Sequence, residues 1–435
     1  MATVLSLITF IIITILGFKY AYVSGSCSVQ SPFNTKYNIH VTSRQRFVLL
    51  LLSVGIIQAG SFSAIILLVW IILLLNLSIK YSTSLKGSRL FNFYGLYLVW
   101  LLISIIFSPE PIFGLRVFSK YLFPFLVLIV VSSISISDVL FLKYLKIAFR
   151  SLITVNILYV ISTLDSGLFN IYNSIFWLGT SLMDVNSFTL VIGLILYQIT
   201  KKKKYLYFII ILILIPILTS VRTGLIGLGV TLLAISFFKY KWRALPFCLI
   251  IIVGLVVSFL YVPGIRDKMF KGAFNNAESI INASEKITLD NIETSGRSDA
   301  WKWSLEKFYK GHEYIGSGLG NLQAVFYSGN HPFGRLKVIH NDYIQILCDI
   351  GLIGLILYLL VIISFVVHSF IIYNNKRNPL TARYAAFIAG TSLCGIMACA
   401  FTDNVINYSL ITLSYPYVFF GFALSFKNRK LIKKL

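Results

Sequence analysis

The sequence predicts an all-α polytopic membrane protein of about 12–13 transmembrane helices, and three observations lead to this prediction. Hydrophobic residues make up 57% of the 435 residues and charged residues only 12%, whereas an ordinary soluble domain carries about 25% charged residues. The mean hydropathy is +0.85. Apolar runs long enough to cross a bilayer also recur along the chain. This composition excludes a soluble enzyme, a disordered protein and a coiled coil.

The first apolar stretch, residues 1–24, has the length of a signal peptide but lacks its charge pattern. No Lys or Arg precedes Lys19, and SGSC at 24–27 is a poor lipoprotein cleavage site. We therefore expect a retained first helix whose N-terminus lies outside the cytoplasm.

The next spans are predicted from runs that contain no Asp, Glu, Lys, Arg or His. The run 47–79 is long enough for two helices and carries QAGSFS (58–63) at its centre, so we expect a helical hairpin there. The remaining runs each predict one span: 90–109, 121–137, 151–164, 185–200, 205–221, 223–238, 244–265, 350–367, 384–402 and 404–426. A re-entrant hairpin would lower the count from 13 to 12.

The basic residues orient these spans. Lys and Arg number 38 against 15 acidic residues, for a net charge of +23. When the spans alternate, all the basic clusters fall on one side: Lys36 with Arg44 and Arg46, Lys80 with Lys86 and Arg89, Lys143 with Lys146, 201–204, 239–243, Lys376 with Arg377, and 427–435. That side is predicted to be cytoplasmic, and its charge is expected to meet anionic lipid rather than nucleic acid.

Three regions follow from this topology. Residues 1–262 are predicted to form the N-terminal transmembrane bundle, and residues 341–435 the C-terminal spans with a basic cytoplasmic tail. Between them, residues 263–340 form one large external loop that holds 8 of the 15 acidic residues. We expect this loop to be a soluble-like cap with short helices, because long loops cross the membrane regardless of their charge.

The topology also brings ionisable residues from distant parts of the sequence to one depth, the outer rim of the membrane. They are Arg116 and Lys120 (in 108–120), Arg222 (in TSVRTG, 219–224), Arg297, His340 and Asp403. An ionisable group at such a place is costly and therefore suggests function. Guanidinium groups match phosphate oxygens and stabilise a departing diphosphate. An imidazole can take a proton from an attacking hydroxyl. The set indicates glycosyl transfer from a polyprenyl-diphosphate sugar.

Simpler interpretations stand beside this one. Arg222 could extend to the lipid headgroups without binding a substrate. His340 could be only the residue that opens a helix. Arg116 and Lys120 could be anchors at the membrane interface.

The segment 297–310 has apolar residues at helical spacing, Trp301, Leu305 and Phe308. This spacing predicts an amphipathic helix that lies on the membrane. Stacking of Trp301 on a sugar is the alternative.

The glycine-rich stretch GSGLGN (316–321) also has two interpretations: a set of backbone N–H groups for phosphate, or a mobile turn. Asp349 lies about 13 Å inward from His340 along a helix, so it must pair within the bundle or stay protonated. The external segments contain no HExxH motif, Cys–His cluster or DxD motif, so we expect no bound metal.

At HNDYIQILCDIGLIGLILYLL (340–360) the chain resembles the bacterial O-antigen ligase and O-antigen polymerase family of membrane glycosyltransferases. The elements TSVRTG (219–224) and GRSDAW…GSGLGN (296–321) agree with that family in order and spacing. The resemblance implies a GT-C-like fold. It also implies metal-independent, inverting transfer from undecaprenyl-diphosphate-linked glycan at the periplasmic face of the bacterial inner membrane, without a cofactor.

The resemblance also assigns roles to residues. It implies that His340 is the base and that Arg222 and Arg297 bind the diphosphate. Asp349 departs from the family, which usually has Glu at that position. From their place at the same rim, we expect Asp403 to orient His340. The remaining candidates are Arg116 and Lys120 as further diphosphate ligands, and Asn341 and Trp301 as contacts to the acceptor sugar.

The function expected from these residues is a polysaccharide polymerase, which transfers the glycan to the acceptor sugar of another lipid-linked repeat unit. The alternative within the family is an O-antigen ligase, whose acceptor is lipid A core. A flippase for lipid-linked sugars is the alternative from another class, but transporters show inverted halves and ionisable groups near the middle of the bilayer. Expected partners are the lipid-linked glycan, its acceptor, membrane lipid and a chain-length regulator protein, with no nucleic acid.

Overall fold

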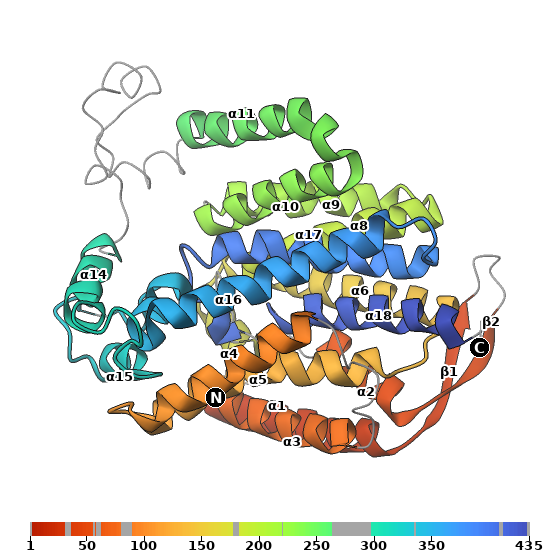
Figure 1. Ribbon diagram of the computed structural model, residues 1–435. Helices are drawn as coiled ribbons and strands as arrows, with labels where there is room; N and C mark the ends of the chain where they lie inside the picture. The colour runs from red at the N-terminus through yellow and green to blue at the C-terminus, as the bar shows by residue number, and fades with distance from the viewer. Residues whose placement is uncertain are drawn as a thin grey trace.

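The chain folds into a bundle of long helices with a small helical cap at one end (Figure 1). The computed structural model describes residues 2–30, 36–54, 57, 62–79, 89–176, 182–219, 221–262, 297–334, 336–408 and 412–432. The bundle helices are α1 (Ala2–Tyr22), α2 (Ser43–Val54), α3 (Ser63–Ile79), α4 (Arg89–Ile106), α5 (Pro111–Ser132), α6 (Asp138–Ser162), α8 (Leu182–Thr200), α9 (Lys204–Leu218), α10 (Arg222–Tyr240), α11 (Leu245–Tyr261), α16 (Asp342–Asn374), α17 (Leu380–Cys399) and α18 (Ser414–Ile432). Shorter elements are α7 (Ser166–Phe176), η4 (Lys241–Ala244), α14 (Arg297–Ser304), the π-helix η7 (Leu305–Tyr309), α15 (Asn321–Ser328) and η8 (Val405–Tyr408).

The prediction of an all-α polytopic membrane protein is confirmed. In the described part of the chain, eight segments are long and apolar enough to cross a membrane. One of them, Arg222–Ser258, contains both α10 and α11. Two shorter apolar helices, Ser63–Ser78 and Lys204–Leu218, add to these. The count of 12 or 13 spans stays a prediction, and most of QAGSFS, at the centre of the expected hairpin, lies outside the described residues.

The central helices are distinguished from the peripheral ones by burial. Of the 18 most apolar consecutive residues in each helix, 78% are buried in α8 and α17, against 22% in α1. The core around α18 is largely aromatic, with Phe141 edge-on to Phe419, Phe422 and Phe426. The outer surfaces of α1 and α11 expose Ile, Leu and Val side chains. Lipid-facing helices need such surfaces, because hydrocarbon offers no partners for polar groups.

Several helices begin earlier than the charge-free runs suggest. Helix α5 starts at Pro111, which suits the first turn because proline lacks an N–H and has a preset φ. Helix α6 starts at Asp138, where the Ser137 hydroxyl accepts a hydrogen bond from the Leu140 N–H. Because α5 begins at Pro111, Arg116 and Lys120 lie within the first three turns of this helix and not in a loop.

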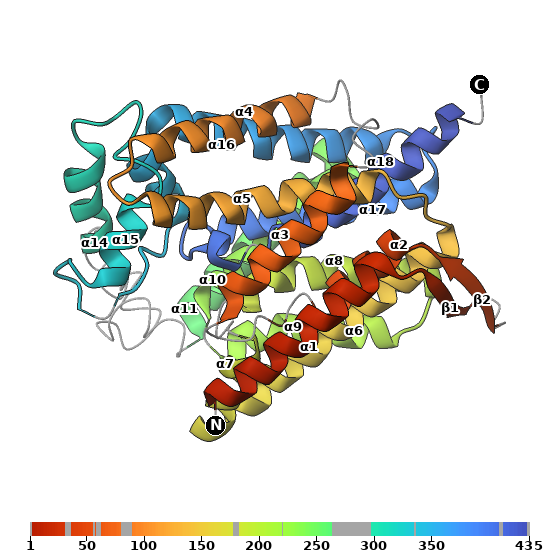
Figure 2. The same ribbon diagram turned by 90° about the horizontal axis from the view of Figure 1, so that it is seen from below.

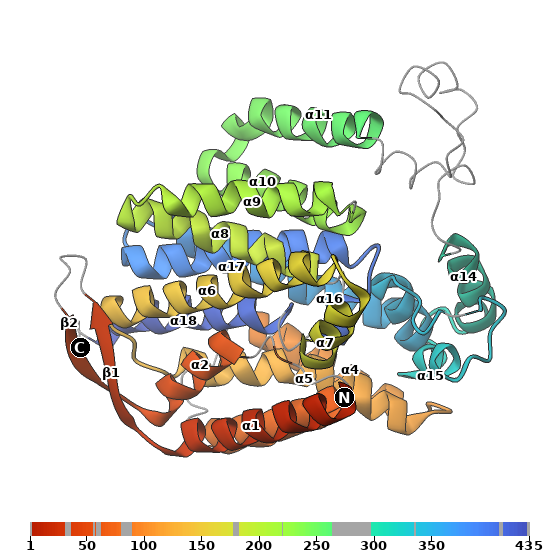
Figure 3. The same ribbon diagram turned by 180° about the vertical axis from the view of Figure 1, so that it is seen from behind.

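A two-stranded antiparallel hairpin, which the sequence analysis did not predict, joins α1 to α2. Strand β1 (Gly25–Gln30) pairs with β2 (Lys36–Val41), with Gly25 opposite Val41. This hairpin and the C-terminus lie at the end of the bundle opposite the cap (Figures 2 and 3). The hairpin is tied to neighbouring helices by basic side chains: Arg46 donates to the carbonyls of Val23 and Ser24, and Lys143 to that of Ser28.

The cap has its own small core. Ala300, Phe308, Leu322, Phe326, Ile339 and Cys348 form this core, and Trp301 and Leu305 pack against it. The apolar face of segment 297–310 is therefore used inside the cap. The expectation that it lies on the membrane as an amphipathic helix is wrong, because α15 and the chain before α16 cover that face. Residues 263–296 of the predicted external loop lie outside the described part of the chain.

The cap is seated on α16 by main-chain hydrogen bonds. The N–H groups of Ser317 and Gly318 donate to the carbonyls of Cys348 and Asp349, both at 2.9 Å. The Asp349 carboxylate accepts from the N–H groups of Gly320, at 3.1 Å, and Leu322, at 2.9 Å. Asp349 thus caps the start of α15. These two hydrogen bonds are the partners within the protein that its buried carboxylate requires.

This arrangement corrects both interpretations of GSGLGN. The N–H groups of Ser317, Gly318 and Gly320 donate to α16 and the others donate elsewhere within the protein, so they do not form an open phosphate site. The turn is also held in place, because Leu319 donates to the Ser104 carbonyl at 3.3 Å and its own carbonyl accepts from the Ser108 hydroxyl at 2.9 Å. A Cβ on Gly318 would collide with the backbone of Ser108.

Helix α16 breaks at Gly351, which makes room for this contact. Gly351 has a φ of +68°, a value that glycine adopts without steric cost. Beyond the break, the N–H of Leu352 donates to the Glu313 carbonyl at 2.8 Å. A Cβ at Gly351 would meet the Tyr314 carbonyl.

We predict that Gly351→Ala lowers the free energy of unfolding by about 2 kcal/mol or more, because a side chain at this φ is strained and also meets the cap. Gly95→Ala on α4 is the matched control, since nothing lies within 4 Å of its added Cβ. Thermal unfolding of both variants in detergent is the measurement. Equal melting temperatures for the two would contradict the seating described here.

Candidate functional site

The candidate site forms where four chain segments meet at the cap end of the bundle. They are the pair His340–Asn341 at the start of α16, the turn 402–404 after α17, the start of α10 at Arg222 and the start of α14 at Arg297. The segments that come first and last in the sequence, the start of α10 and the turn 402–404, are more than a hundred residues apart. Hydrogen bonds to the turn 402–404 hold the segments together.

His340 has a strained backbone. Its φ is +54°, in the left-handed region that residues with a side chain rarely adopt. Its N–H donates to Asn404 Oδ1 at 2.6 Å, and its ring Nδ1 lies 3.0 Å from Asp403 Oδ1. Strain of this kind costs about 1–3 kcal/mol and persists where the surrounding structure enforces it, often at functional sites. The expected pairing of Asp403 with His340 is present in the structure.

A buried hydrogen-bond network around Asn404 fixes the turn 402–404 against α16. Asn404 Nδ2 donates to Asp342 Oδ1 and to Gln345 Oε1, both at 2.9 Å. Asp342 in turn accepts from the Ile406 N–H at 3.1 Å. Asn404 is 1% exposed, so these bonds are shielded from water and hold one geometry.

Asn341 is the N-cap of α16. Its side-chain oxygen accepts from the Ile344 N–H at 3.0 Å, and the residue is buried. Trp301 is half-buried in the cap, and its indole N–H donates to the Ile339 carbonyl at 2.9 Å, next to His340. Both residues therefore support the His340 segment. Their contact with an acceptor sugar stays a prediction.

The two arginines predicted to act together do lie together. The guanidinium of Arg297 donates to the Thr402 carbonyl, and Thr223, next to Arg222, forms a 3.0 Å hydroxyl pair with Thr402. Burial lowers the pKa of Arg297, and the nearby Arg222 cation lowers it further, while Asp403 acts in the opposite direction. Two guanidinium groups close enough to repel each other form a site suited to a multiply charged anion.

Arg116 and Lys120 belong to a different surface. They line a cavity of about 900 Å³ that also includes His340. Its other walls come from α3, α15 and the chain before α16, through Leu67, Gln323 and Lys337 among others. Lys120 is 7% exposed and donates to Asn407 Oδ1. The interpretation of Lys120 as an anchor at the membrane interface is therefore wrong, because its ammonium group is enclosed.

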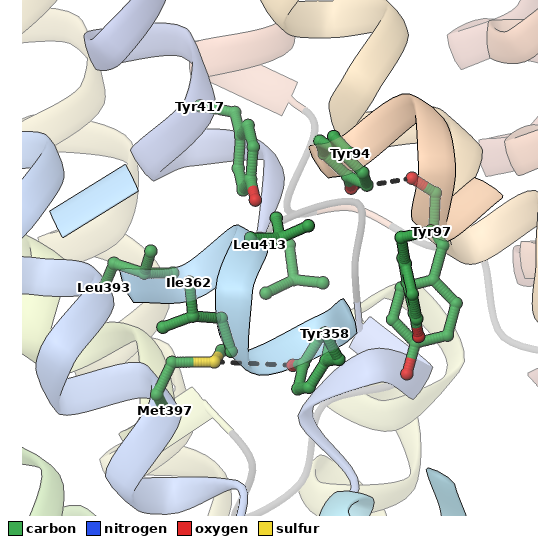
Figure 4. Close-up of a pocket in the computed structure, with 10 residues that line it drawn as sticks. Tyr94, Tyr97, Tyr358, Ile362, Leu393, Met397, Leu413 and Tyr417 are labelled. Atoms are coloured by element: carbon green, nitrogen blue, oxygen red, sulfur yellow. Dashed lines mark hydrogen bonds between the residues drawn. The ribbon is translucent and has the colours of Figure 1, made fainter. Parts of the chain in front are cut away.

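A second cavity, lined by tyrosines, lies deeper in the bundle. It has a volume of only about 10 Å³, and Tyr94, Tyr97 and Tyr358 line it (Figure 4). Tyr94 donates to the Tyr121 carbonyl at 2.8 Å, and Tyr358 to Met397 Sδ at 3.4 Å. This volume is about the minimum that holds one water molecule, so of these two cavities the larger is the one with room for a sugar.

Sequence reasoning missed the partners that assemble the site. Thr223 lies inside TSVRTG, which was singled out for Arg222, and Thr402 directly precedes Asp403, but a hydroxyl gives no signal of its own. Lys337 stood in an irregular stretch with no periodicity to place it. Among the described residues, no group of three His, Cys, Asp or Glu side chains is placed to hold a metal ion.

The strain at His340 can be tested by comparing two substitutions. Both His340→Gly and His340→Ala remove the imidazole and its contact with Asp403, but only glycine accepts a φ of +54° without strain. We expect the glycine variant to be the more stable by about 1 kcal/mol. Paired thermal unfolding experiments measure this difference, and an alanine variant at least as stable as the glycine variant would contradict the strain.

Comparison with known families agrees with the resemblance that the motifs indicated. Residues 206–359 match the family model described as O-antigen ligase. The match includes Arg222, Arg297 and His340, and it confirms the resemblance to the O-antigen ligase and polymerase family that the motifs indicated. No curated protein matches the chain.

Proposed function

We propose that this chain, whose residues 206–359 match the O-antigen ligase family, is a polysaccharide polymerase of the bacterial inner membrane that acts at the periplasmic face. It transfers a glycan from undecaprenyl diphosphate to a hydroxyl of another lipid-linked repeat unit. The observation that carries the proposal is the continuous row from the arginine pair through the turn 402–404 to His340.

In the proposed reaction His340 is the general base. When its Nδ1–H donates to Asp403, the lone pair of Nε2 is left to take the proton of the acceptor hydroxyl. The hydroxyl oxygen forms a bond to the anomeric carbon of the donor. Asp403 holds the ring in this tautomer and stabilises the imidazolium that forms.

The arginines act on the leaving group. As the new glycosidic bond forms, the bond between the anomeric carbon and the diphosphate oxygen breaks, and negative charge gathers on the diphosphate. Arg222 and Arg297 stabilise that charge. They supply the positive charge that a metal ion provides in other glycosyltransferases, so the proposed mechanism is metal-independent. Attack from the face opposite the diphosphate inverts the anomeric configuration.

An O-antigen ligase is the second candidate, because the family match covers residues that both activities share. In a ligase the same base and arginines would act, and only the acceptor would change to lipid A core. A flippase is disfavoured because the Arg–Thr–Asp–His row lies at the cap end of the bundle, whereas a transporter keeps its site near the middle of the membrane.

The proposal predicts that His340→Ala, Arg222→Ala and Arg297→Ala each lower the rate of glycan transfer by about a hundredfold or more. The assay follows long-chain glycan in cells that make the cognate repeat unit, at matched membrane levels of each variant. Arg243→Ala is the control, since that arginine is exposed in η4 at the other end of α10. Unchanged glycan in all three site variants would refute the catalytic assignment.

The product in a deletion strain separates the two candidates. Loss of a polymerase leaves single repeat units on the acceptor. Loss of a ligase leaves long polymer on its lipid carrier. We expect single units, and unlinked polymer would identify a ligase instead.

A further inference from the structure

The cations near His340 fall into two groups. Arg222 and Arg297 adjoin the Thr402–Asp403 turn, which holds the Nδ1 side of the imidazole. Arg116, Lys120 and Lys337 line the 900 Å³ cavity that His340 also borders. One diphosphate needs only one of these groups. The second group therefore requires an explanation of its own.

Lys120 shows that the cavity is built for an anion. Lys120 is only 7% exposed, and its hydrogen-bond partner is the neutral amide oxygen of Asn407, which also accepts from Gln323 at 3.3 Å. Among the described residues, no carboxylate lies within ion-pair distance of its ammonium. The Asp342 carboxylate attracts this ammonium without forming an ion pair with it, and Arg116 repels it. A basic group buried without a direct ion pair is costly, and a bound anion would relieve that cost.

Two further cations stand at the same cavity around an aromatic ring. The guanidinium of Arg116 lies 5.7 Å from the centre of the Tyr327 ring, and Lys337 Nζ lies 5.9 Å from it. With Lys120 they place three basic side chains at the cavity. Phosphate groups are recognised by such clusters, where arginine contributes paired donors and lysine a point charge.

The remaining wall of the cavity is apolar and comes from helices of the bundle. Leu67 and Leu68 of α3 and Leu115 of α5 line it, and Leu68 and Leu115 are both more than half exposed. A cavity with an apolar wall and three cations suits an amphiphile with a phosphate headgroup. Its volume is at the upper end of the range for ligand sites, about 300–1,000 Å³, so a short glycan fits as well.

We propose that this cavity binds the acceptor, and that Lys120, Arg116 and Lys337 hold the diphosphate of its lipid carrier. This rests on the proposed function and adds the residues that bind its acceptor. The glycan of the acceptor runs from the cationic group to His340, whose Nε2 is the ring nitrogen left for the acceptor hydroxyl. The donor's diphosphate stays with Arg222 and Arg297, so each diphosphate has its own cations.

The test uses the full-length protein in lipid vesicles and a donor that can only donate, because the accepting hydroxyl of its glycan is methylated. Two acceptors carry the same repeat unit, one on polyprenyl diphosphate and one on a neutral alkyl glycoside. We expect the KM for the diphosphate acceptor to be about tenfold lower than for the neutral one, because only the former meets the three cations.

Lys120→Met should remove that preference by raising the KM of the diphosphate acceptor about tenfold, with the neutral acceptor unchanged. Lys337 is exposed, so its substitution leaves the fold intact. Lys337→Ala should likewise raise the KM of the diphosphate acceptor alone, by about threefold. Lys310→Met on the exposed side of the cap is the matched control and should change neither KM. Arg297→Ala should instead slow transfer to both acceptors alike.

Three results would overturn the inference: a wild type that does not discriminate between the acceptors, a Lys120→Met variant that affects both equally, or one that affects neither. Transfer to lipid A core alone, with a KM that Lys120→Met raises, would assign the cavity to the phosphates of that acceptor and refute the polyprenyl carrier. Absence of transfer to every acceptor by the wild type would refute the proposed function and this inference together.

Discussion

The three-residue turn Thr402–Asp403–Asn404 is the constraint on which the candidate site depends. Its Thr402 carbonyl accepts from Arg297, its Asp403 carboxylate meets the His340 ring, and its Asn404 amide accepts from the His340 backbone. The same amide donates to Asp342 and Gln345 inside α16. Because one turn contacts the cap, His340 and helix α16, a shift of the turn would move all of them together.

The seating of the cap is the second requirement, because Arg297 is a cap residue that must reach a turn of the bundle. Asp349 and the carbonyls before the break in α16 receive the N–H groups of the glycine-rich turn. The break at Gly351 exists for this contact, since the backbone of Glu313 and Tyr314 takes the hydrogen bonds that a continuous helix would have made itself. The glycines of GSGLGN, which the sequence suggested as a phosphate-binding loop, thus attach the cap to α16.

The sequence predicted the helical membrane fold well, because hydropathy reports directly on which segments need a lipid environment. It also identified the His340–Asp403 pair and the proximity of Arg222 and Arg297, through charge at a shared depth and through family resemblance. It failed where the outcome depends on tertiary packing. Nothing local reveals that α15 covers the apolar face of 297–310, or that α5 begins early enough to place Lys120 within a cavity. The hairpin β1–β2 was missed because attention to apolar runs passes over short polar strands.

The docking of the cap has a consequence for how such proteins diversify. Ser317, Gly318 and Gly320 attach the cap through main-chain atoms, with Asp349 as the one side chain that receives them. Side chains on the outward surface of the cap, such as Glu306 and Lys310, take no part in this attachment. The outward face can therefore change in sequence while Arg297 keeps its contact with Thr402, so selection on that face is separate from selection on the residues beneath it.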